Sequence, residues 1–188
     1  MKVTLYRLKQ YVDFNWSPEE LAERLAVVRQ VLIGAFMLVS ISANAADKVT
    51  VTINKQTISA YRTVDLEAAK KEAVAAKKPI AWVASSPKLL DGTGTISGNG
   101  SKGATLHAFY ALRDRCVLVF MDAFEENHKV LQLVDDALHT PDPHYTPPTV
   151  VFLDPEAKQV LAKVIYEKDF TKRANDLAKA LQEVKGKL

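Results

Sequence analysis

The one thiol that could carry redox or nucleophilic chemistry is Cys116. It is the only cysteine among 188 residues, so the chain can form no intramolecular disulfide, no CxxC pair and no zinc site built from several cysteines. Cys116 also opens the apolar run 116–121 (CVLVFM), where a thiol behaves as a small hydrophobic group with a raised pKa. We therefore predict neither dithiol oxidoreductase activity nor a reactive role for Cys116.

A second candidate is the glycine-rich stretch 91–103 (DGTGTISGNGSKG), which holds five of the seven glycines. It follows a predicted strand, opens a predicted helix and carries Lys102, so its backbone N–H groups could surround an anion. The spacing fits neither G-x-x-x-x-G-K-[ST] nor a complete G-x-G-x-x-G signature. The stretch is either an anion-binding loop or, as the spacing favours, a flexible insertion in a surface loop.

The four histidines, His107, His128, His139 and His144, form no recognisable metal motif. No two of them have the i, i+4 spacing of a helical metal site, and spacing alone assigns no Ser–His–Asp triad. His144 is kept as a binding candidate because it lies in a proline-bounded loop that leads to Pro148. We expect no catalytic residue, no metal and no cofactor.

The charge balance argues against a nucleic-acid partner. The formal net charge is +3, with 25 Lys and Arg against 22 Asp and Glu. The doublets Lys70-Lys71, Lys77-Lys78 and Lys172-Arg173 are interpreted as solvated helix faces. A nucleic-acid-binding domain would instead gather its basic residues on one face with interleaved aromatic residues.

Residues 26–45 have the parts of a secretory signal peptide. Arg29 precedes the apolar run 31–41 (VLIGAFMLVSI), and Ala43-Asn44-Ala45 follows as a small-x-small cleavage site. The run is shorter than the roughly 20 residues that span a bilayer. We predict cleavage after Ala45, export to the periplasm or medium, and no stable membrane span afterwards. If the segment is not used, the protein is cytoplasmic or membrane-anchored.

Residues 1–25 precede this signal and have a different character. The stretches 8–13 (LKQYVD) and 17–22 (SPEELA) resemble the start of the phenylalanyl-tRNA synthetase β subunit. Nothing after Leu25 resembles a synthetase, so aminoacylation is not implied. Either the leader is a true fusion, or translation begins downstream at Leu25, Val27 or Val28, which would restore an ordinary signal peptide. The expected organisation is a leader (1–25), a signal peptide (26–45) and one folded domain (46–188).

Behind the signal, strands and helices alternate. Extended or apolar runs predict strands at 49–53, 57–61, 80–84, 116–121, 149–153 and 160–165. Helical spacing predicts helices at 65–76, 104–114, 127–138 and 171–185, the first capped by Asp65. Residues 154–158 form a hairpin turn. This order predicts a mostly parallel sheet with helices on both faces, to which the closing hairpin adds one antiparallel strand.

This succession resembles the thioredoxin family over residues 57–185. The stretch 145–154 (YTPPTVVFLD) is similar to the family's cis-proline segment and fourth strand, and 65–85 to its first helix and the strand before its active site. The resemblance implies a three-layer α/β sandwich with a central mixed sheet. Ser85-Ser86-Pro87-Lys88 and the glycine-rich insertion, after the second core strand, stand where the family has its CxxC motif.

The resemblance also implies a surface beside Pro148 that binds extended peptides. We expect an exported, non-redox thioredoxin-like domain that binds protein or peptide segments. One alternative is an enzyme or anion-binding protein that uses the glycine-rich loop with Lys102 or His144. Another is a relative of thiol-disulfide oxidoreductases that has lost activity and has no ligand. The candidate binding residues are Ser85, Ser86, Lys102, His144, Tyr145, Pro147, Pro148 and Thr149; the sequence assigns no oligomeric state.

Overall fold

A computed structural model of the chain describes residues 48–90, 95–124, 130–141 and 145–188. The chain divides into two units, Met1–Ala45 and Ala46–Leu188, and every described residue belongs to the second. The predicted leader and signal segment, together with His128 and His144, lie outside the described residues. Among the residues that are described, no helix is long and apolar enough to cross a membrane.

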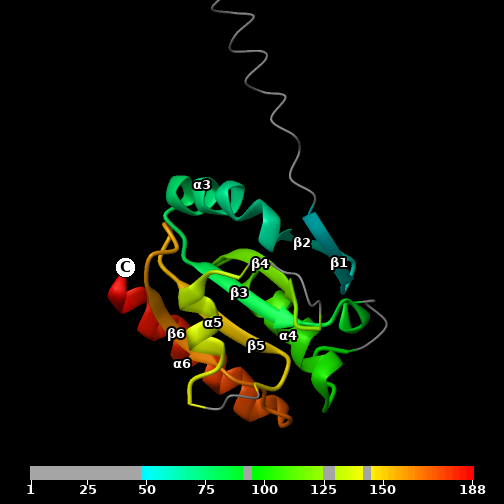
Figure 1. The fold of residues 1–188 in the computed structure, drawn as a ribbon. Coiled ribbons are helices and arrows are strands. Elements are labelled where there is room, and N and C mark those ends of the chain that lie inside the picture. Colours follow the sequence, from blue (N-terminus) through cyan, green and yellow to red (C-terminus); the bar gives the residue numbers. More distant parts are fainter. Residues whose placement is uncertain (1–47, 91–94, 125–129, 142–144) are drawn as a thin grey trace, which may run out of the picture. The chain divides into compact units, whose positions relative to one another are not determined.

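Six strands form one mixed sheet (Figure 1). They are β1 (Lys48–Ile53), β2 (Gln56–Arg62), β3 (Ile80–Ser85), β4 (Val117–Asp122), β5 (Thr149–Leu153) and β6 (Val160–Val164). Their spatial order is β1-β2-β4-β3-β5-β6. The pairs β2–β4 and β3–β4 are parallel, whereas β1–β2, β3–β5 and β5–β6 are antiparallel.

A mixed sheet was predicted and is present, but the prediction that it is mostly parallel was wrong. Two features add antiparallel pairing: the β1–β2 hairpin, and the insertion of β5 beside β3 in the opposite direction. The direction of a pairing depends on which strands become neighbours in space, and the alternation of strands and helices along the chain does not fix this.

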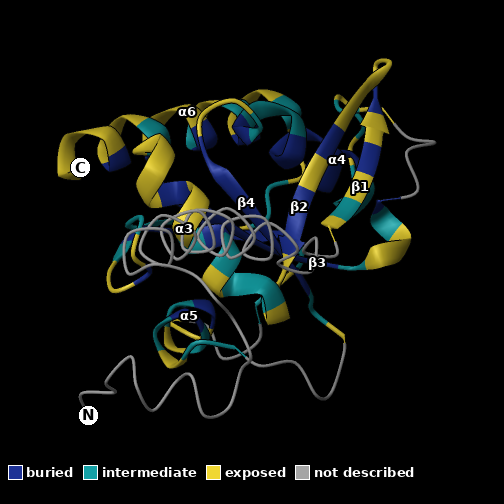
Figure 2. Ribbon diagram, turned by 90° about the horizontal axis from the view of Figure 1, so that it is seen from above, coloured by how far each residue is buried: buried dark blue, intermediate teal, exposed yellow. Residues whose placement is uncertain are grey.

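Helices cover both faces of the sheet, as predicted (Figure 2). They are α3 (Leu66–Ala76), α4 (Ser101–Leu112), α5 (Gln132–Leu138) and α6 (Phe170–Lys187), with 3-10 turns at η1 (Thr63–Asp65) and η2 (Pro87–Leu89). Side chains of α4 and α6 pack on one face, and those of α3 and α5 pack on the other. The described domain is therefore a three-layer α/β arrangement.

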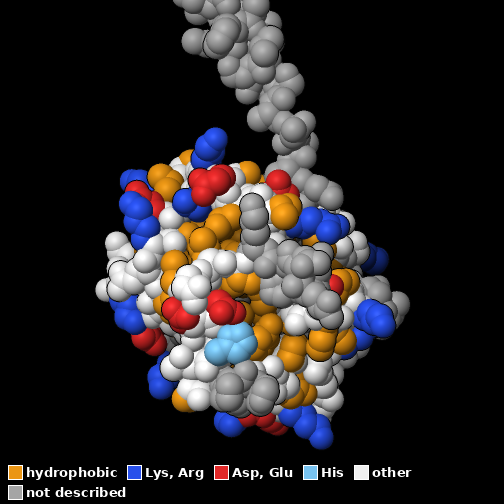
Figure 3. Space-filling view, in the orientation of Figure 1, with side chains coloured by type: hydrophobic (Ala, Val, Ile, Leu, Met, Phe, Trp, Pro, Cys, Tyr) orange, Lys and Arg blue, Asp and Glu red, His pale blue; other side chains and the backbone are white. Residues whose placement is uncertain are grey.

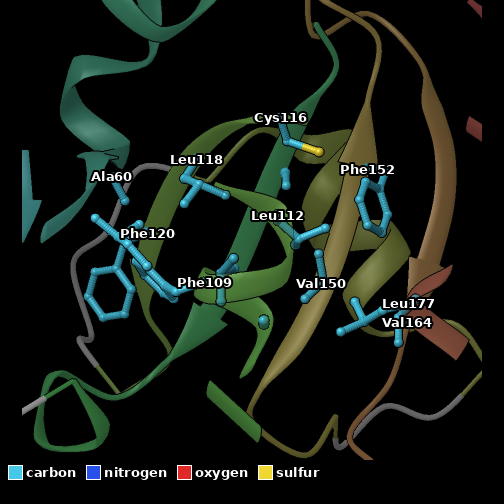
Figure 4. Close-up of a cluster of buried hydrophobic side chains, with 14 of the residues drawn as sticks. Ala60, Phe109, Leu112, Cys116, Leu118, Phe120, Val150, Phe152, Val164 and Leu177 are labelled. Atoms are coloured by element: carbon cyan, nitrogen blue, oxygen red, sulfur yellow. The ribbon is translucent and has the colours of Figure 1, made fainter. Parts of the chain in front are cut away.

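The interior strands β3 and β4 form the centre of the core. All six residues of β3 are buried, as expected for a strand that is covered on both faces. Trp82 is fully buried, and its indole N–H donates to the sulfur of Met121 at 3.5 Å. On the other face, Phe109 and Leu112 of α4 gather with side chains of the sheet and of α6 (Figure 4).

The structure differs from the prediction at the starts of two helices and at one predicted cap. α4 begins at Ser101, so residues 101–103, assigned to the loop, are helical; the Ala104 N–H donates to the Gly100 carbonyl at 2.9 Å. α5 begins only at Gln132. Asp65 stands at the N-cap of α3, but its side chain makes no capping hydrogen bond.

One small apolar residue on each of two helices faces water. On α3, Ala69 and Ala73 are buried, but Val74 is 50% exposed. On α6, Ala178 is exposed, and the buried positions are Arg173, Leu177, Ala180 and Val184. Each residue advances about 100° around a helix, so a neighbour of a buried position easily faces water.

Candidate functional site

The carboxyl end of the central strands gathers several of the predicted site residues. In the parallel pair β3–β4, Ser85 is the register partner of Asp122. In the antiparallel pair β3–β5, Ala84 is the partner of Thr149, which places Pro148 opposite Ser85. Residues from three strands therefore meet at one end of the sheet.

The Ser85 hydroxyl is committed to an internal hydrogen bond. It lies 2.7 Å from the Thr105 hydroxyl of α4, and the Thr105 hydroxyl donates to the Ser101 carbonyl at 2.8 Å. Since Thr105 has only one hydroxyl proton, Ser85 must donate to Thr105. Both side chains are fully buried. The Ser85 side chain thus links β3 to α4, whereas the adjacent Ser86 is partly exposed.

The segment that enters β5 has a distinctive backbone. The Pro147–Pro148 peptide bond is cis, and Pro148 and Thr149 are buried while Tyr145 and Pro147 are partly exposed. The Thr149 hydroxyl donates to the Thr146 carbonyl at 3.0 Å, which fixes the turn into the strand. Neither proline has an N–H, so the backbone at this point can offer only carbonyl acceptors.

Tyr145 is surrounded by groups that the sequence did not single out. The His139 ring meets the Tyr145 ring edge-on, with centroids 5.5 Å apart. Burial, with the charges of Asp135 and Asp122, raises the pKa of the Tyr145 hydroxyl. The backbone N–H of Phe124 donates to Asp122 at 3.0 Å, and the Phe124 ring is 70% exposed.

The surface beside α5 contains further apolar groups. Figure 3 shows hydrophobic side chains over the middle of this face, with Lys and Arg mainly around its margin. Leu131 and Leu133 are partly buried against the same core cluster as Tyr145. An aromatic and acidic surface therefore lies next to the cis-proline segment.

One hollow at this end of the sheet is small. It measures about 10 Å³ and lies between Pro148, Ala104 and Ala108 of α4, and Ile165. This is room for about one water molecule, whereas pockets for small organic ligands measure about 300–1,000 Å³.

The described part of the glycine-rich loop is held by Arg173 of α6. One guanidinium nitrogen donates to the carbonyls of Ile96 and Gly98, at 3.0 and 3.2 Å. The other terminal nitrogen donates to the carbonyls of Glu167 and Lys168, both at 3.1 Å. These contacts fasten the loop to the start of α6.

Arg173 is the main structural residue that the sequence analysis missed. The doublet Lys172-Arg173 was interpreted as a solvated face, but Arg173 is only 3% exposed. Its hydrogen-bond partners are four carbonyl oxygens and a histidine, and none is a carboxylate. A signal was present: Arg173 precedes the buried Leu177 by four residues, which places both on one helix face.

His107 of α4 completes the contacts of Arg173. Its Nδ1 accepts from the Arg173 Nε at 3.4 Å, and its ring stacks at 4.9 Å from that of Phe170. Burial lowers the pKa of His107, and the nearby positive charge of Arg173 lowers it further. Because an imidazolium has no free acceptor nitrogen, the contact requires neutral His107.

Close packing of two glycines also shapes this loop. A Cβ added to Gly103 in the first turn of α4 would collide with the carbonyl of Gly98. The Gly98 N–H itself donates to the Thr95 carbonyl at 3.0 Å. Lys102 lies in the same helical turn and is partly buried.

Cys116 is buried, and burial raises the pKa of its thiol to about 12 despite the opposing charges of Lys78 and Arg115. The prediction of a buried thiol with a raised pKa is confirmed. No group of three His, Cys, Asp or Glu side chains among the described residues could hold a metal ion.

Compared with known proteins, the chain matches no family model and no curated protein sequence.

Proposed function

We propose that residues 57–185 form a thioredoxin-like domain without redox activity, which binds extended peptide or protein segments. The fold supports this proposal through the order β2-β4-β3-β5-β6, with β5 and β6 antiparallel to their neighbours and helices on both faces. The observation that carries it is the position of Pro148 opposite Ser85, with Tyr145 and Asp122 near one another, at a sheet end that has no cysteine.

The cis-proline segment has the chemistry of a peptide-binding edge. An extended peptide needs acceptors for its N–H groups and a surface for alternate side chains. The backbone before Pro148 supplies carbonyls, while Tyr145 and Phe124 supply aromatic surface. The carboxylate of Asp122 adds a negative charge beside that surface.

The lack of a cysteine pair removes dithiol chemistry without removing this edge. Hydrogen bonds to a bound backbone do not require cysteine. Cys116 cannot substitute, since it is buried with a strongly raised thiol pKa at the start of β4, away from the carboxyl end of the sheet.

The alternative of an anion-binding glycine loop has less support. An anion cradle needs N–H groups directed at the ligand. In the described part of the loop, the carbonyls of Ile96 and Gly98 are directed at Arg173, and the Gly98 N–H is already used. These contacts favour a structural role for the loop.

Selection from random displayed peptides provides the test. We expect the wild-type chain to enrich extended peptides, and Phe124→Ala/Tyr145→Ala to weaken a selected peptide by about tenfold or more in fluorescence anisotropy. The matched control is Val64→Ala/Val74→Ala, which truncates two other exposed apolar side chains. Failure to enrich any peptide, or equal loss in the control, would leave the inactive relative without a ligand as the better description.

Export is proposed from the predicted signal segment at residues 26–45. N-terminal sequencing of the protein from its native cell should give Ala46. A sequence that begins at Met1 would contradict export by this signal.

A further inference from the structure

The amino end of β3 and β4 carries a groove that the peptide-binding proposal does not use. Its volume is about 570 Å³, far larger than the hollow beside Pro148. Three segments line it: the turn from α3 into β3, the turn from α4 into β4, and the last turns of α6. This volume falls within the range of pockets that bind small organic ligands.

The fold brings the first two segments together through the central strands. Ile80 and Val117 are register partners in the parallel pair β3–β4, and the Val117 N–H donates to the Pro79 carbonyl at 2.9 Å. The turns that precede these strands must therefore be neighbours. Figure 1 shows the carboxyl ends of α3 and α6 on the same side of the molecule.

The groove gathers positive charge from all three segments. Lys77 and Lys78 come from the first turn, Arg115 from the second and Lys185 from α6. Within the described residues, none of these four side chains forms an ion pair. Asp114, the acidic side chain that lines the groove, is paired with Arg113 at 3.3 Å.

The two lysines after α3 close the helix with their backbone groups, and the charge of Lys78 also helps to lower the pKa of Glu72. The Lys77 and Lys78 N–H groups close the end of α3 on the carbonyls of Val74 and Ala73. Lys77, Arg115 and Lys185 are exposed, and Lys78 is partly exposed. Part of the positive charge compensates the negative ends of the α3 and α6 dipoles, but four cations exceed what two helix ends require.

Apolar side chains and the amide of Gln182 form the rest of the lining. Leu181 is partly exposed, while Pro79 and Val184 are buried at the base. The aliphatic stems of the lysines extend this surface. A ligand that matches both parts needs an anionic head and an apolar body.

We propose that this groove binds a small amphipathic carboxylate, with its carboxylate among Lys77, Lys78, Arg115 and Lys185 and its apolar body against Leu181. A simple anion would gain only exposed ion pairs, each of which contributes little in water. Apolar burial beside Leu181 supplies the additional stabilisation. This groove and the proposed peptide-binding surface lie at opposite ends of the central strands. The carboxylate proposal and the peptide proposal can therefore each fail without the other.

Calorimetric titration of the full chain with dodecanoate, below its micelle concentration, tests this site. We expect one dodecanoate per chain, weaker binding at high salt, and no comparable binding of dodecyltrimethylammonium or propionate. The first probe reverses the head charge and the second lacks the tail. Equal binding of the cationic probe would overturn the proposal, as would the absence of dodecanoate binding.

Charge-reversal variants locate the binding. Lys78→Glu/Lys185→Glu should weaken dodecanoate at least tenfold, whereas Lys71→Glu/Lys179→Glu, with the same charge change at exposed positions of α3 and α6 outside the groove, should retain most of the affinity. Equal loss in the two pairs, or no loss in the first, would show that the anion binds elsewhere. If the first pair disturbs the fold, two milder variants replace it. Arg115→Gln and Leu181→Ser should each weaken dodecanoate binding severalfold, and unchanged binding in both would overturn the proposal.

Discussion

The two ends of the central sheet use their polar groups in opposite ways. At the carboxyl end, the hydroxyls of Ser85 and Thr105 and the guanidinium of Arg173 are buried and hydrogen-bonded internally. At the amino end, the cations of the 570 Å³ groove are directed at solvent. A buried polar group stabilises a fold only when it is fully paired, whereas an exposed cation remains available to a ligand. The role of a polar residue therefore depends less on its type than on whether other groups of the protein already satisfy its hydrogen bonds.

The largest expected effect is on the alkylation rate of Cys116. This rate tests whether burial or the nearby positive charge determines the reactivity of the thiol at the amino end of the sheet. Lys78 and Arg115 favour the thiolate, but burial outweighs them and raises the thiol pKa to about 12. We expect alkylation by iodoacetamide near pH 8 to be about a thousandfold slower in the native protein than in concentrated guanidinium chloride. Comparable rates in the two states would mean that the groove cations activate the thiol.

A pair of arginine substitutions compares the two ends directly. Arg173→Met removes a buried guanidinium that donates to four carbonyls, and we expect it to lower the free energy of unfolding by about 3 kcal/mol. Arg115→Met removes an exposed cation and should change the free energy of unfolding by less than about 0.5 kcal/mol. Urea denaturation measures both, and similar losses would contradict the distinction between the ends.

A pair of glycine substitutions tests how tightly the carboxyl-end loop is packed. In Gly103→Ala the new methyl group meets the Gly98 carbonyl, and we expect a loss of about 1–3 kcal/mol. Gly100→Ala is the control, because its Cβ would enter open space and its φ of 169° is extended. Thermal unfolding of both should separate them by several degrees.

The smallest expected effect is a pH dependence that originates at His107. Its folded pKa is lowered, so the unfolded state takes up the proton first. The stabilisation is fully present above the unfolded pKa of about 6.5 and is lost as pH falls below that value. Urea midpoints between about pH 8 and pH 5 should fall more steeply for the wild type than for His107→Gln. Parallel curves would assign the dependence to other groups.

The sequence was sufficient for the elements but not for the contacts between them. The strand at 149–153 and the hairpin after it were predicted nearly to the residue, because apolar runs and turn residues are local signals. The pairing of β3 with β5 and the hydrogen bond between Ser85 and Thr105 are long-range contacts that no local pattern contains.

Arg173 shows the same limit at a single residue. The charge of Arg173 and its charged neighbour Lys172 indicate a solvent-exposed helix face. Only the position of Arg173, four residues before the buried Leu177, indicates that it is buried. Asp122 and His139 were not predicted for the candidate site, because the fold alone brings them near Tyr145. His144 was predicted for it and lies outside the described residues.

The hydroxyl pair of Ser85 and Thr105 has a consequence for engineering. A cysteine introduced at position 85 would not create a reactive centre, because the side chain there has no exposed surface and contacts Thr105 of α4 rather than solvent. Burial would disfavour its thiolate, as it does at Cys116. An engineered thiol in this domain would therefore have to be placed at an exposed neighbour such as position 86, which is only partly buried.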